Sequence, residues 1–485
     1  MSPPGIRPFW KNFIRGRWVE GCRGRRIPLE DPATAEPLAE VSRAEVEDVA
    51  PAVEAARKAF DSGALRSMKP AERMDLLFCV AAELEGLVAE IGLAECLDNG
   101  KRITDARSQA GASARYFRYY GGLADKLEGR TIPLGEGYLD YTVLEPYGVS
   151  AQVVPWNFPL QLAVRSLSCA LATGNSVVIK APVLCPLSVL LLGEACERAG
   201  VPEGTVNILC GRGGDVGRAL VAHPGVDHVV FTGSVPTGQA ILREAAERVI
   251  PAVMELGGKS AGVVYPDADL DAVADDVMSG AFSNAGQICS ILSRIIVHGS
   301  VHDDLLDRVI RRTEALTIGP GIEDHDVTPL ISADQLEKVE RLCRGAEASG
   351  AGRVTGGRRV SGLPGHFFPP TVYAEVRPDM EIGQEEVFGP VLSFMRFETP
   401  EEAVRLANGT EFGLVAGVYT HDLDLAHWTA GRLLAGQVFV NEWFAGGVET
   451  PFGGTRRSGF GREKGQEALL NYVQTKNVAI RLQTP

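Results

Sequence analysis

Between residues 149 and 231 the chain repeats one pattern, in which a short apolar run is followed by a stretch with helical spacing. The apolar runs lie at 149–154, 176–180, 205–209 and 226–231, and the helical stretches at 159–171, 187–199 and 216–222. Strands that alternate with helices in this way are typical of βαβ units, which place the strands parallel in one sheet. The pattern therefore predicts an α/β fold, and runs at 250–256 and 260–264 are candidates to extend the sheet.

A second alternating series follows residue 257 and is long enough for a separate α/β domain. Its expected strands lie at 294–297, 391–396, 416–420 and 437–440. Residues 1–127 have mainly helical patterns, with helices expected over about 42–60, 71–90 and 105–124. Ser42 is the candidate N-cap of the first helix, because an acidic residue follows three positions later. A chain of 485 residues is long enough for about three domains.

Two segments have strand patterns outside these series. Residues 130–148 look like two strands joined by a glycine turn, and residues 475–482 alternate as a last strand would. A hairpin between helical regions is a candidate arm that pairs outside its own domain.

Charge and composition argue against several functions. Lys and Arg total 48 against 62 Asp and Glu, so the net charge is −14, and such a surface repels phosphate backbones. Hydrophobic residues make up 45% of the chain, which argues against global disorder. No apolar run is long enough to span a bilayer, and the N-terminus has no signal-peptide core. We therefore expect a cytoplasmic protein that binds neither nucleic acid nor membranes.

The nine cysteines and eight histidines do not form a pattern of metal ligands. The number of cysteines is odd and no pair has CxxC spacing, which disfavours a disulfide framework or a structural zinc site. Because the histidines do not cluster at ligand spacing either, we predict no metal. Most of the cysteines are expected to be small buried hydrophobic residues, and the open question is whether one of them is a nucleophile.

Two glycine-rich turns follow predicted strands and open helices, where backbone N–H groups can bind anions. Residues 211–217 read GRGGDVG, which resembles a dinucleotide fingerprint, but the spacing is GxGxxxG and the usual ribose-binding acid is not clear. Residues 231–238 read FTGSVPTG and add a serine hydroxyl. An ordinary turn and an ordinary capped helix remain open as alternatives.

Four further motifs contain side chains suited to catalysis. Asn157 follows a predicted strand, and its amide can donate to an oxyanion. Glu255 precedes two glycines, whose freedom suits a general base. Cys289 lies in NAGQICS, a polar setting in which a thiolate is accessible, and Glu386 and Phe388 lie in EEVFGP. The alternatives are a turn asparagine, a surface glutamate, an inert cysteine and a charged turn with a packed ring.

The order of the motifs is more informative than any one of them. Along the chain follow PWNFPL, the strand end at Lys180, FTGS, ELGGKS, GQICS, EEVFGP and PFGGTRRSGFGRE. Together they resemble the aldehyde dehydrogenase superfamily, in its non-phosphorylating, hydrolytic type that uses NAD or NADP. The resemblance extends from about residue 14 to residue 478, and it favours the functional interpretation of each motif.

The resemblance implies a three-part α/β architecture with a Rossmann-like cofactor domain. The expected parts are a discontinuous cofactor-binding domain at 1–125 and 147–257, a catalytic domain at 258–458, and an oligomerisation arm at 126–146 and 459–485. Because such an arm normally pairs with a neighbouring subunit, the resemblance implies a homodimer or homotetramer.

The resemblance also implies roles for residues. Cys289 would attack the aldehyde and carry a thiohemiacetal and then a thioester, while Asn157 and the Cys289 N–H hold the oxyanion. Glu255 would activate water for hydrolysis. The implied cofactor is NAD, with NADP as a second candidate. Twelve residues would contact it, and among them Lys180 would reach the adenosine ribose. These residues are Val154, Trp156, Lys180, Gly213, Gly217, Phe231, Thr232, Gly233, Ser234, Leu256, Glu386 and Phe388.

Val183 stands where the family often has a glutamate that grips the adenosine ribose, so the choice between NAD and NADP stays open. The implied substrate channel is mostly apolar, which favours an aliphatic or aromatic aldehyde of moderate size. It comprises Phe158, Leu162, Arg165, Ile288, Ser290, Phe444 and Phe452. Succinate-semialdehyde enzymes share the arginine at Arg165, but their second arginine is Ser283 here, so that substrate is the alternative. A catalytically inactive structural or binding member of the family is a further alternative.

Overall fold

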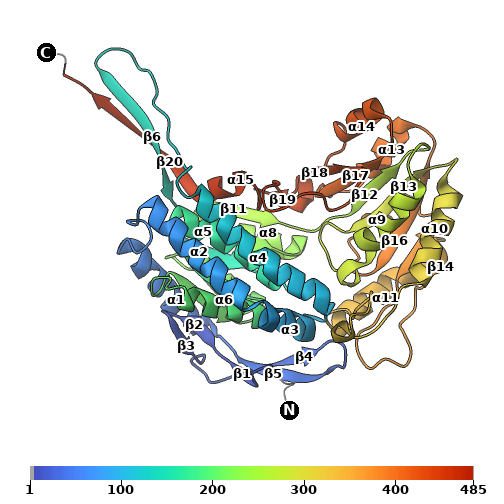
Figure 1. Cartoon of the computed structure of the whole chain (residues 1–485), viewed down its shortest axis with the longest axis horizontal. Coiled ribbons are helices and arrows are strands. Elements are labelled where there is room, and N and C mark those ends of the chain that lie inside the picture. The colour runs from blue at the N-terminus through green and yellow to red at the C-terminus, as the bar shows by residue number, and fades with distance from the viewer. Residues whose placement is uncertain (1–4, 484–485) are drawn as a thin grey trace.

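The computed structural model describes residues 5–483, which form two bodies centred on sheets and a projecting two-stranded arm (Figure 1). The first body has an eight-stranded sheet of order β19-β11-β10-β7-β8-β9-β2-β3. Its strands are β2 (Asn12–Ile14), β3 (Arg17–Val19), β7 (Val149–Val153), β8 (Ser176–Ala181), β9 (Val206–Cys210), β10 (His228–Thr232), β11 (Ala252–Glu255) and β19 (Gly459–Phe460). The strands from β11 to β9 are parallel, as the alternating pattern predicts.

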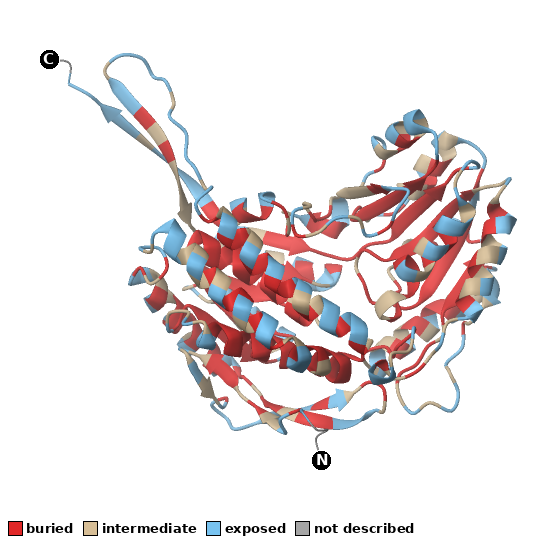
Figure 2. Cartoon of the chain, viewed as in Figure 1, coloured by how far each residue is buried: buried red, intermediate tan, exposed pale blue. Residues whose placement is uncertain are grey.

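Helices cover both faces of this sheet (Figure 1). They are α1 (Val46–Asp61), α2 (Pro70–Gly86), α3 (Val88–Asn99), α4 (Ile103–Leu123), α5 (Pro159–Thr173), α6 (Leu187–Arg198), α7 (Arg218–Ala222) and α8 (Val235–Arg248). Alternation along a strand sends neighbouring side chains to opposite faces. In β8, Val177 and Ile179 accordingly pack in one hydrophobic cluster and Val178 in another, and Figure 2 shows the resulting buried interior.

The second body has a seven-stranded sheet of order β14-β15-β16-β13-β12-β17-β18. Its elements are β12 (Ser260–Val264), β13 (Leu292–His298), β14 (Gly352–Thr355), β15 (Thr371–Ala374), β16 (Val391–Phe397), β17 (Val415–Tyr419), β18 (Gln437–Val440), α9 (Leu270–Phe282), α10 (His302–Glu314), α11 (Ala333–Ala348), α12 (Glu381–Gln384), α13 (Pro400–Ala407) and α14 (Leu423–Ala430). The expectation that residues 260–264 extend the first sheet is wrong, because β12 pairs with β13 and β17 in the second sheet. The chain crosses between the bodies at Gly257 and Gly258, directly after β11.

The arm pairs β6 (Tyr138–Pro146) antiparallel with β20 (Val473–Arg481), which follows α15 (Glu467–Leu470). The expected hairpin within residues 130–148 is only partly right. Its first segment forms a single bridge, between Thr131 and Tyr141, and the long partner of β6 is the last strand of the chain. Much of the arm is exposed (Figure 2).

The prediction that residues 1–127 are mainly helical is wrong before residue 46. Besides β2 and β3, this part holds a three-stranded sheet of β1 (Phe9–Trp10), β4 (Arg26–Asp31) and β5 (Glu36–Ser42). Ser42 therefore ends a strand and does not cap α1, where instead the Glu45 N–H donates to the Asp48 carboxylate at 2.8 Å. The helix expected at 71–90 is two helices, α2 and α3, separated at Leu87.

Two further observations concern the chain from residue 5 to residue 483. None of its helices is both long and apolar enough to cross a membrane. Over the same range, no three His, Cys, Asp or Glu side chains are grouped so that they could hold a metal ion.

Candidate active site

Cys289 follows a strained turn, the short helix η2 (Ser283–Gly286). Asn284, Ala285 and Gly286 have φ angles of 50°, 52° and 72°, all in the left-handed region that favours glycine. A Cβ atom on Gly286 would lie 2.1 Å from the carbonyl oxygen of Gly389, so that position has room only for glycine. Strained backbone of this kind concentrates at functional sites, and here it sets the position of Cys289.

Two cavities meet at Cys289 and Asn157, since both residues line both cavities. The first has a volume of 340 Å³, and its lining includes the whole expected substrate channel. These residues are Phe158, Leu162, Arg165, Ile288, Ser290, Phe444 and Phe452. The second has a volume of 160 Å³ and is lined by Glu255 and seven residues of the expected cofactor set. These seven are Trp156, Thr232, Gly233, Ser234, Leu256, Glu386 and Phe388.

Asn157 lies between the end of β7 and the start of α5 and is 4% exposed. Its Nδ2 donates to the backbone carbonyl of Gln287 at 3.0 Å, and the backbone carbonyl of Asn157 accepts from Asn284 Nδ2 at 3.3 Å. A primary amide has two N–H donors, so one N–H of Asn157 remains for a ligand. The arrangement fixes the amide next to Cys289, on the border of the two cavities.

Burial is the main cause of the pKa shifts of Glu255 and Cys289. Glu255 ends β11, is 2% exposed, and its Oε1 has no partner within the described chain. Burial raises the pKa of Glu255, Glu463 raises it further, and Arg165 lowers it. Burial likewise raises the pKa of the Cys289 thiol, with Glu255 adding to the shift and Arg165 opposing it. Perturbed acids that share a cleft are typical of catalytic sites.

Residues from both bodies line the second cavity. Ser234 is the N-cap of α8, where N–H groups are free for an anion. Across the cavity, Glu386 Oε1 accepts the N–H of Gly258 at 3.0 Å, and burial raises the pKa of Glu386. Phe388 has a φ of 58°, and its ring meets that of Trp156 edge-on at 5.2 Å.

Five residues of the expected cofactor set lie outside the lining of the second cavity: Val154, Lys180, Gly213, Gly217 and Phe231. Lys180 lies near the end of β8, and burial lowers its pKa to about 8. The Val154 N–H donates to the Lys180 carbonyl at 3.1 Å, while Phe231 is buried in β10. Residues 213–217 form the π-helical turn η1 (Gly213–Gly217), in which a Cβ atom on Gly217 would lie 3.9 Å from Lys180 Cδ.

The structure adds cavity residues that the sequence did not indicate, and four of them carry polar or charged side chains of interest. Gln335 and Lys338, on α11, line the second cavity, and Gln335 Nε2 donates to the Phe388 carbonyl at 2.7 Å. Lys101 and Lys464 line the first cavity. Because α11 reads as an ordinary amphipathic helix, it gave no local signal, whereas Lys464 directly follows the matched motif PFGGTRRSGFGRE.

The model of the aldehyde dehydrogenase family matches residues 18–478. The chain belongs to the aldehyde dehydrogenase family. This aldehyde dehydrogenase is 39% identical to the mitochondrial benzaldehyde dehydrogenase of Antirrhinum majus, over 100% of this chain and 91% of that one. It is 38% identical to Retinal dehydrogenase 2 of Homo sapiens, over 98% of this chain and 92% of that one. The NAD+ complex of an aldehyde dehydrogenase from Bacillus cereus matches with a TM-score of 0.96 and 38% identity, over 98% and 97% of the two chains. The expected family and α/β fold are thus confirmed.

Proposed function

We propose that this aldehyde dehydrogenase oxidises an aldehyde to the carboxylic acid with NAD, using Cys289 as the nucleophile. The observation that carries the proposal is the position of Cys289 and Asn157 on the border of two cavities. A thiol in that position can meet an aldehyde from one side and a cofactor from the other. A covalent intermediate divides one difficult step into two easier ones.

The reaction begins when the Cys289 thiol loses its proton to solvent and the thiolate adds to the aldehyde carbon, which forms the thiohemiacetal oxyanion. The free amide N–H of Asn157 and the backbone N–H of Cys289 donate to the oxyanion. Bound NAD would supply the hydride acceptor for this carbon, and Cys289 would then carry the thioester. Glu255 takes a proton from water, the hydroxide attacks the thioester carbon, and the C–S bond breaks to release the acid and the Cys289 thiolate. The raised pKa of Glu255 brings it closer to the working pH, which suits a general base.

The second cavity and the strand ends beside it suit the parts of NAD. The N-terminus of α8, with Gly233 and Ser234, suits the pyrophosphate. The Glu386 carboxylate suits the nicotinamide ribose hydroxyls, and Lys180, next to the η1 turn, suits the adenosine ribose. Val183 carries no charge that would repel a 2′-phosphate, so NADP is a second cofactor candidate.

The proposed substrate is an aliphatic or aromatic aldehyde of moderate size. The lining of the first cavity contains a group of aromatic and aliphatic side chains, including Phe158, Leu162, Ile288 and Phe452. A volume of 340 Å³ falls in the range of pockets that hold small organic ligands. Two of the relatives are named for benzaldehyde and retinal, which are uncharged aldehydes with apolar bodies.

An aldehyde that carries a carboxylate is a second candidate, because four cationic residues line the same cavity: Lys101, Arg102, Arg165 and Lys464. The Arg165 guanidinium and the Lys464 ammonium lie 5.4 and 5.3 Å from the ring centre of Phe452. Arg165 is 3.5 Å from the Glu463 carboxylate. Arg165→Ala should lower kcat/KM for carboxylate-bearing aldehydes by about 10- to 150-fold, the strength of a hydrogen bond to a charged group, and spare neutral ones. Equal losses for both classes would mean that Arg165 is structural.

A panel of neutral and carboxylate-bearing aldehydes, each assayed with NAD and with NADP, tests the function. We expect formation of reduced cofactor with neutral aldehydes, and loss of that activity in Cys289→Ala with cofactor affinity retained. Substantial activity in Cys289→Ala would mean that another residue is the nucleophile. No reduction of cofactor with any aldehyde would favour the inactive-member alternative.

The remaining parts of the proposal concern organisation. We propose a cofactor-binding domain at 1–125 and 147–257 and a catalytic domain at 258–458. Of the expected oligomerisation arm at 126–146 and 459–485, Gly459–Phe460 instead pairs in the sheet of the first body as β19, and the projecting part is β6 and β20. The exposed ribbon of β6 and β20 supports a homodimer or homotetramer. A cytoplasmic location is consistent with nine cysteines that form no disulfide within residues 5–483, since disulfides are rare in that compartment.

A further inference from the structure

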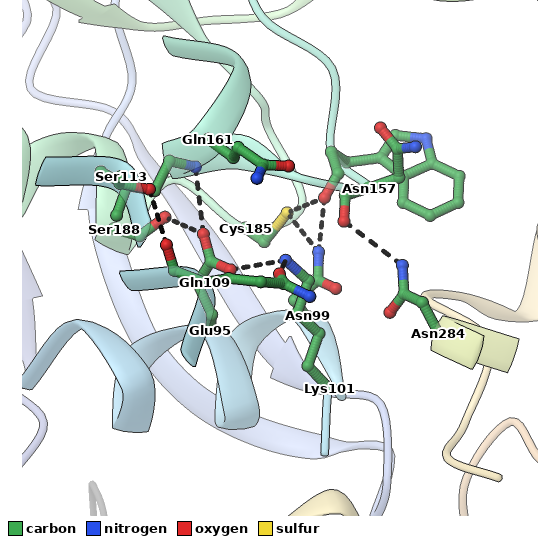
Figure 3. Close-up of polar contacts among 12 residues, drawn as sticks. Glu95, Asn99, Lys101, Gln109, Ser113, Asn157, Gln161, Cys185, Ser188 and Asn284 are labelled. Atoms are coloured by element: carbon green, nitrogen blue, oxygen red, sulfur yellow. Dashed lines mark hydrogen bonds and ion pairs between the residues drawn. The ribbon is translucent and has the colours of Figure 1, made fainter. Parts of the chain in front are cut away.

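The buried carboxylate of Glu95, near the end of α3, contacts α5, α6 and Lys101 in the first body. Glu95 is 2% exposed, and its Oε1 accepts the Leu160 N–H at 3.0 Å and the Ser188 hydroxyl at 2.9 Å. Its Oε2 lies 2.5 Å from Lys101 Nζ (Figure 3). Leu160 and Ser188 lie in the first turns of α5 and α6, where N–H groups lack helical partners and negative charge is favoured.

Lys101 connects this carboxylate to the first cavity. It is 1% exposed, and its Nζ also donates to Gln109 Oε1 on α4 at 2.9 Å. The ammonium lies 4.5 Å from the ring centre of Phe158, which is a favourable cation–π contact. Lys101 and Phe158 both line the first cavity, so the ion pair is located directly beneath the wall of that cavity.

Residues 95–101 contact the turn around Asn157 at every second residue, which are positions 156, 158 and 160. Asn99 Nδ2 donates to the carbonyl of Trp156, Lys101 lies against the ring of Phe158, and Glu95 accepts from Leu160. On the opposite side, Asn157 Nδ2 donates to the Gln287 carbonyl. In Figure 3, Glu95, Asn99 and Lys101 gather on the side of this turn away from Asn284.

We propose that Glu95 and Lys101 are positioning residues, which hold the turn of Asn157 so that its free amide N–H points at the oxyanion. The inference rests on the proposed function, in which Asn157 donates to that oxyanion. A buried ion pair adds little stability compared with apolar residues of the same size. The ion pair instead has a positioning role. Lys101 contacts Phe158 and Glu95 contacts Leu160, and these contacts fix the residues on the C-terminal side of Asn157.

The test is a double-mutant cycle between Lys101→Met and Asn157→Ala. The burst of reduced cofactor in the first turnover reports acylation and hydride transfer. Lys101→Met alone should slow that burst about 10- to 100-fold, the size expected when a catalytic group is displaced by about 1 Å, and leave KM for NAD within about twofold. In the Asn157→Ala background the same substitution should change the burst rate by less than about twofold, because the donor that it positions is gone.

Ser188→Ala is the matched control. Ser188 donates to the same carboxylate oxygen as Leu160 but belongs to α6, so its loss should leave the burst rate within about twofold of wild type. If Lys101→Met leaves an unpaired charge that prevents folding, the double variant Glu95→Gln/Lys101→Met removes both charges and enters the cycle instead.

The outcomes separate the two proposals. Equal slowing by Lys101→Met in both backgrounds would overturn the positioning role and leave the proposed function in place. A burst unchanged by Asn157→Ala alone would instead remove Asn157 from the oxyanion site. A rise in KM for NAD without a slower burst would show that Lys101 acts on cofactor binding, and this also overturns the inference.

Discussion

At the scale of single residues, the surroundings of Glu255 change the pKa of its carboxyl group and so the pH dependence of hydrolysis. It is buried, its Oε1 has no partner within residues 5–483, and Glu463 adds to the effect of burial in raising its pKa. A carboxylate base works only when deprotonated. Because the pKa is raised, the active form is lost at a higher pH than for a surface glutamate as the pH falls.

Glu255→Gln should therefore separate the two halves of the reaction. We expect a rapid burst of reduced cofactor followed by a slow steady state, since acylation needs no base at this position but hydrolysis does. General-base catalysis contributes about 10²- to 10⁴-fold, which sets the expected loss of the steady-state rate. The wild-type steady-state rate should also rise with pH as Glu255 ionises, and the variant should lack that rise. Stopped-flow absorbance from about one pH unit below neutrality to about two units above it measures both. Loss of the burst itself would assign Glu255 to an earlier step.

Val183 is the residue on which the choice of cofactor depends in our hypothesis. It is half-buried, three residues beyond Lys180. Two like charges about 4 Å apart at an effective dielectric near 20 repel by about 4 kcal/mol, so a glutamate here should reject a 2′-phosphate strongly. We expect Val183→Glu to raise the ratio of kcat/KM for NAD over NADP by at least about tenfold. Leu184→Glu, an exposed neighbour, is the control for added charge, and a wild type that already rejects NADP as strongly as the variant would contradict the hypothesis.

Residues within contiguous motifs were accessible from the sequence, but residues brought in by packing were not. Asn157, Glu255 and Cys289 each lie in a short motif at the end of a strand or turn, and the fold brings all three to one cavity wall. Lys338 reaches that wall from the surface of α11, and Lys101 reaches the first cavity from the segment after α3. Nothing in their local sequence distinguishes them from ordinary charged residues, because their positions depend on contacts between distant segments.

Among elements, buried strands were easier to predict than edge strands. The strands β7 to β10 are buried over their full length, so each reads as a mainly apolar run. β2 and β3 have only three residues each, too few to show alternation. The first and last strands of the arm pair across more than 300 residues of sequence, from Pro146 with Val473 to Tyr138 with Arg481, and no local pattern indicates such a partner.

The turn η2 gives a prediction at this scale. A methyl group at Gly286 would meet the Gly389 carbonyl at 2.1 Å, and the φ of 72° is unfavourable for alanine. Gly286→Ala should therefore displace the whole turn together with Cys289, and lower kcat at least about 100-fold, with a stability loss of about 1–3 kcal/mol. Gly111→Ala, where a Cβ atom on α4 meets nothing within 4 Å, is the control. Aldehyde oxidation and thermal unfolding are the measurements, and full activity in Gly286→Ala would show that the turn adapts without moving the thiol.

Across the whole molecule, the two bodies divide the site between them. Asn157 and Glu255 come from the first body, whereas Cys289 and Glu386 come from the second. The chain passes between the bodies at Gly257, where a Cβ atom would lie 2.5 Å from the Glu386 carboxylate. The site is therefore complete only when the two bodies are docked, and this explains why no single motif in the sequence specifies it.

The arm supports a prediction about assembly. A two-stranded ribbon is marginally stable on its own in water, yet β6 and β20 project from the body (Figure 1). Leu139 and Ile480 are register partners on this ribbon and are 40% and 39% exposed. Exposed apolar side chains on an arm indicate a surface that another chain covers. We therefore expect the protein to have a mass of two or four times 51.9 kDa in solution, and Leu139→Lys/Ile480→Lys to shift it toward smaller species.

Light scattering coupled to size exclusion measures that shift. Val354→Lys is the matched control, since it places the same charge on an exposed apolar position of β14, in the other body. A single chain already forms the second cavity with the residues proposed to hold the cofactor, so we expect the dissociated variant to keep its cofactor affinity while losing thermal stability. An unchanged mass in the arm variant, or an equal shift in Val354→Lys, would mean that the arm is not the surface through which the subunits associate.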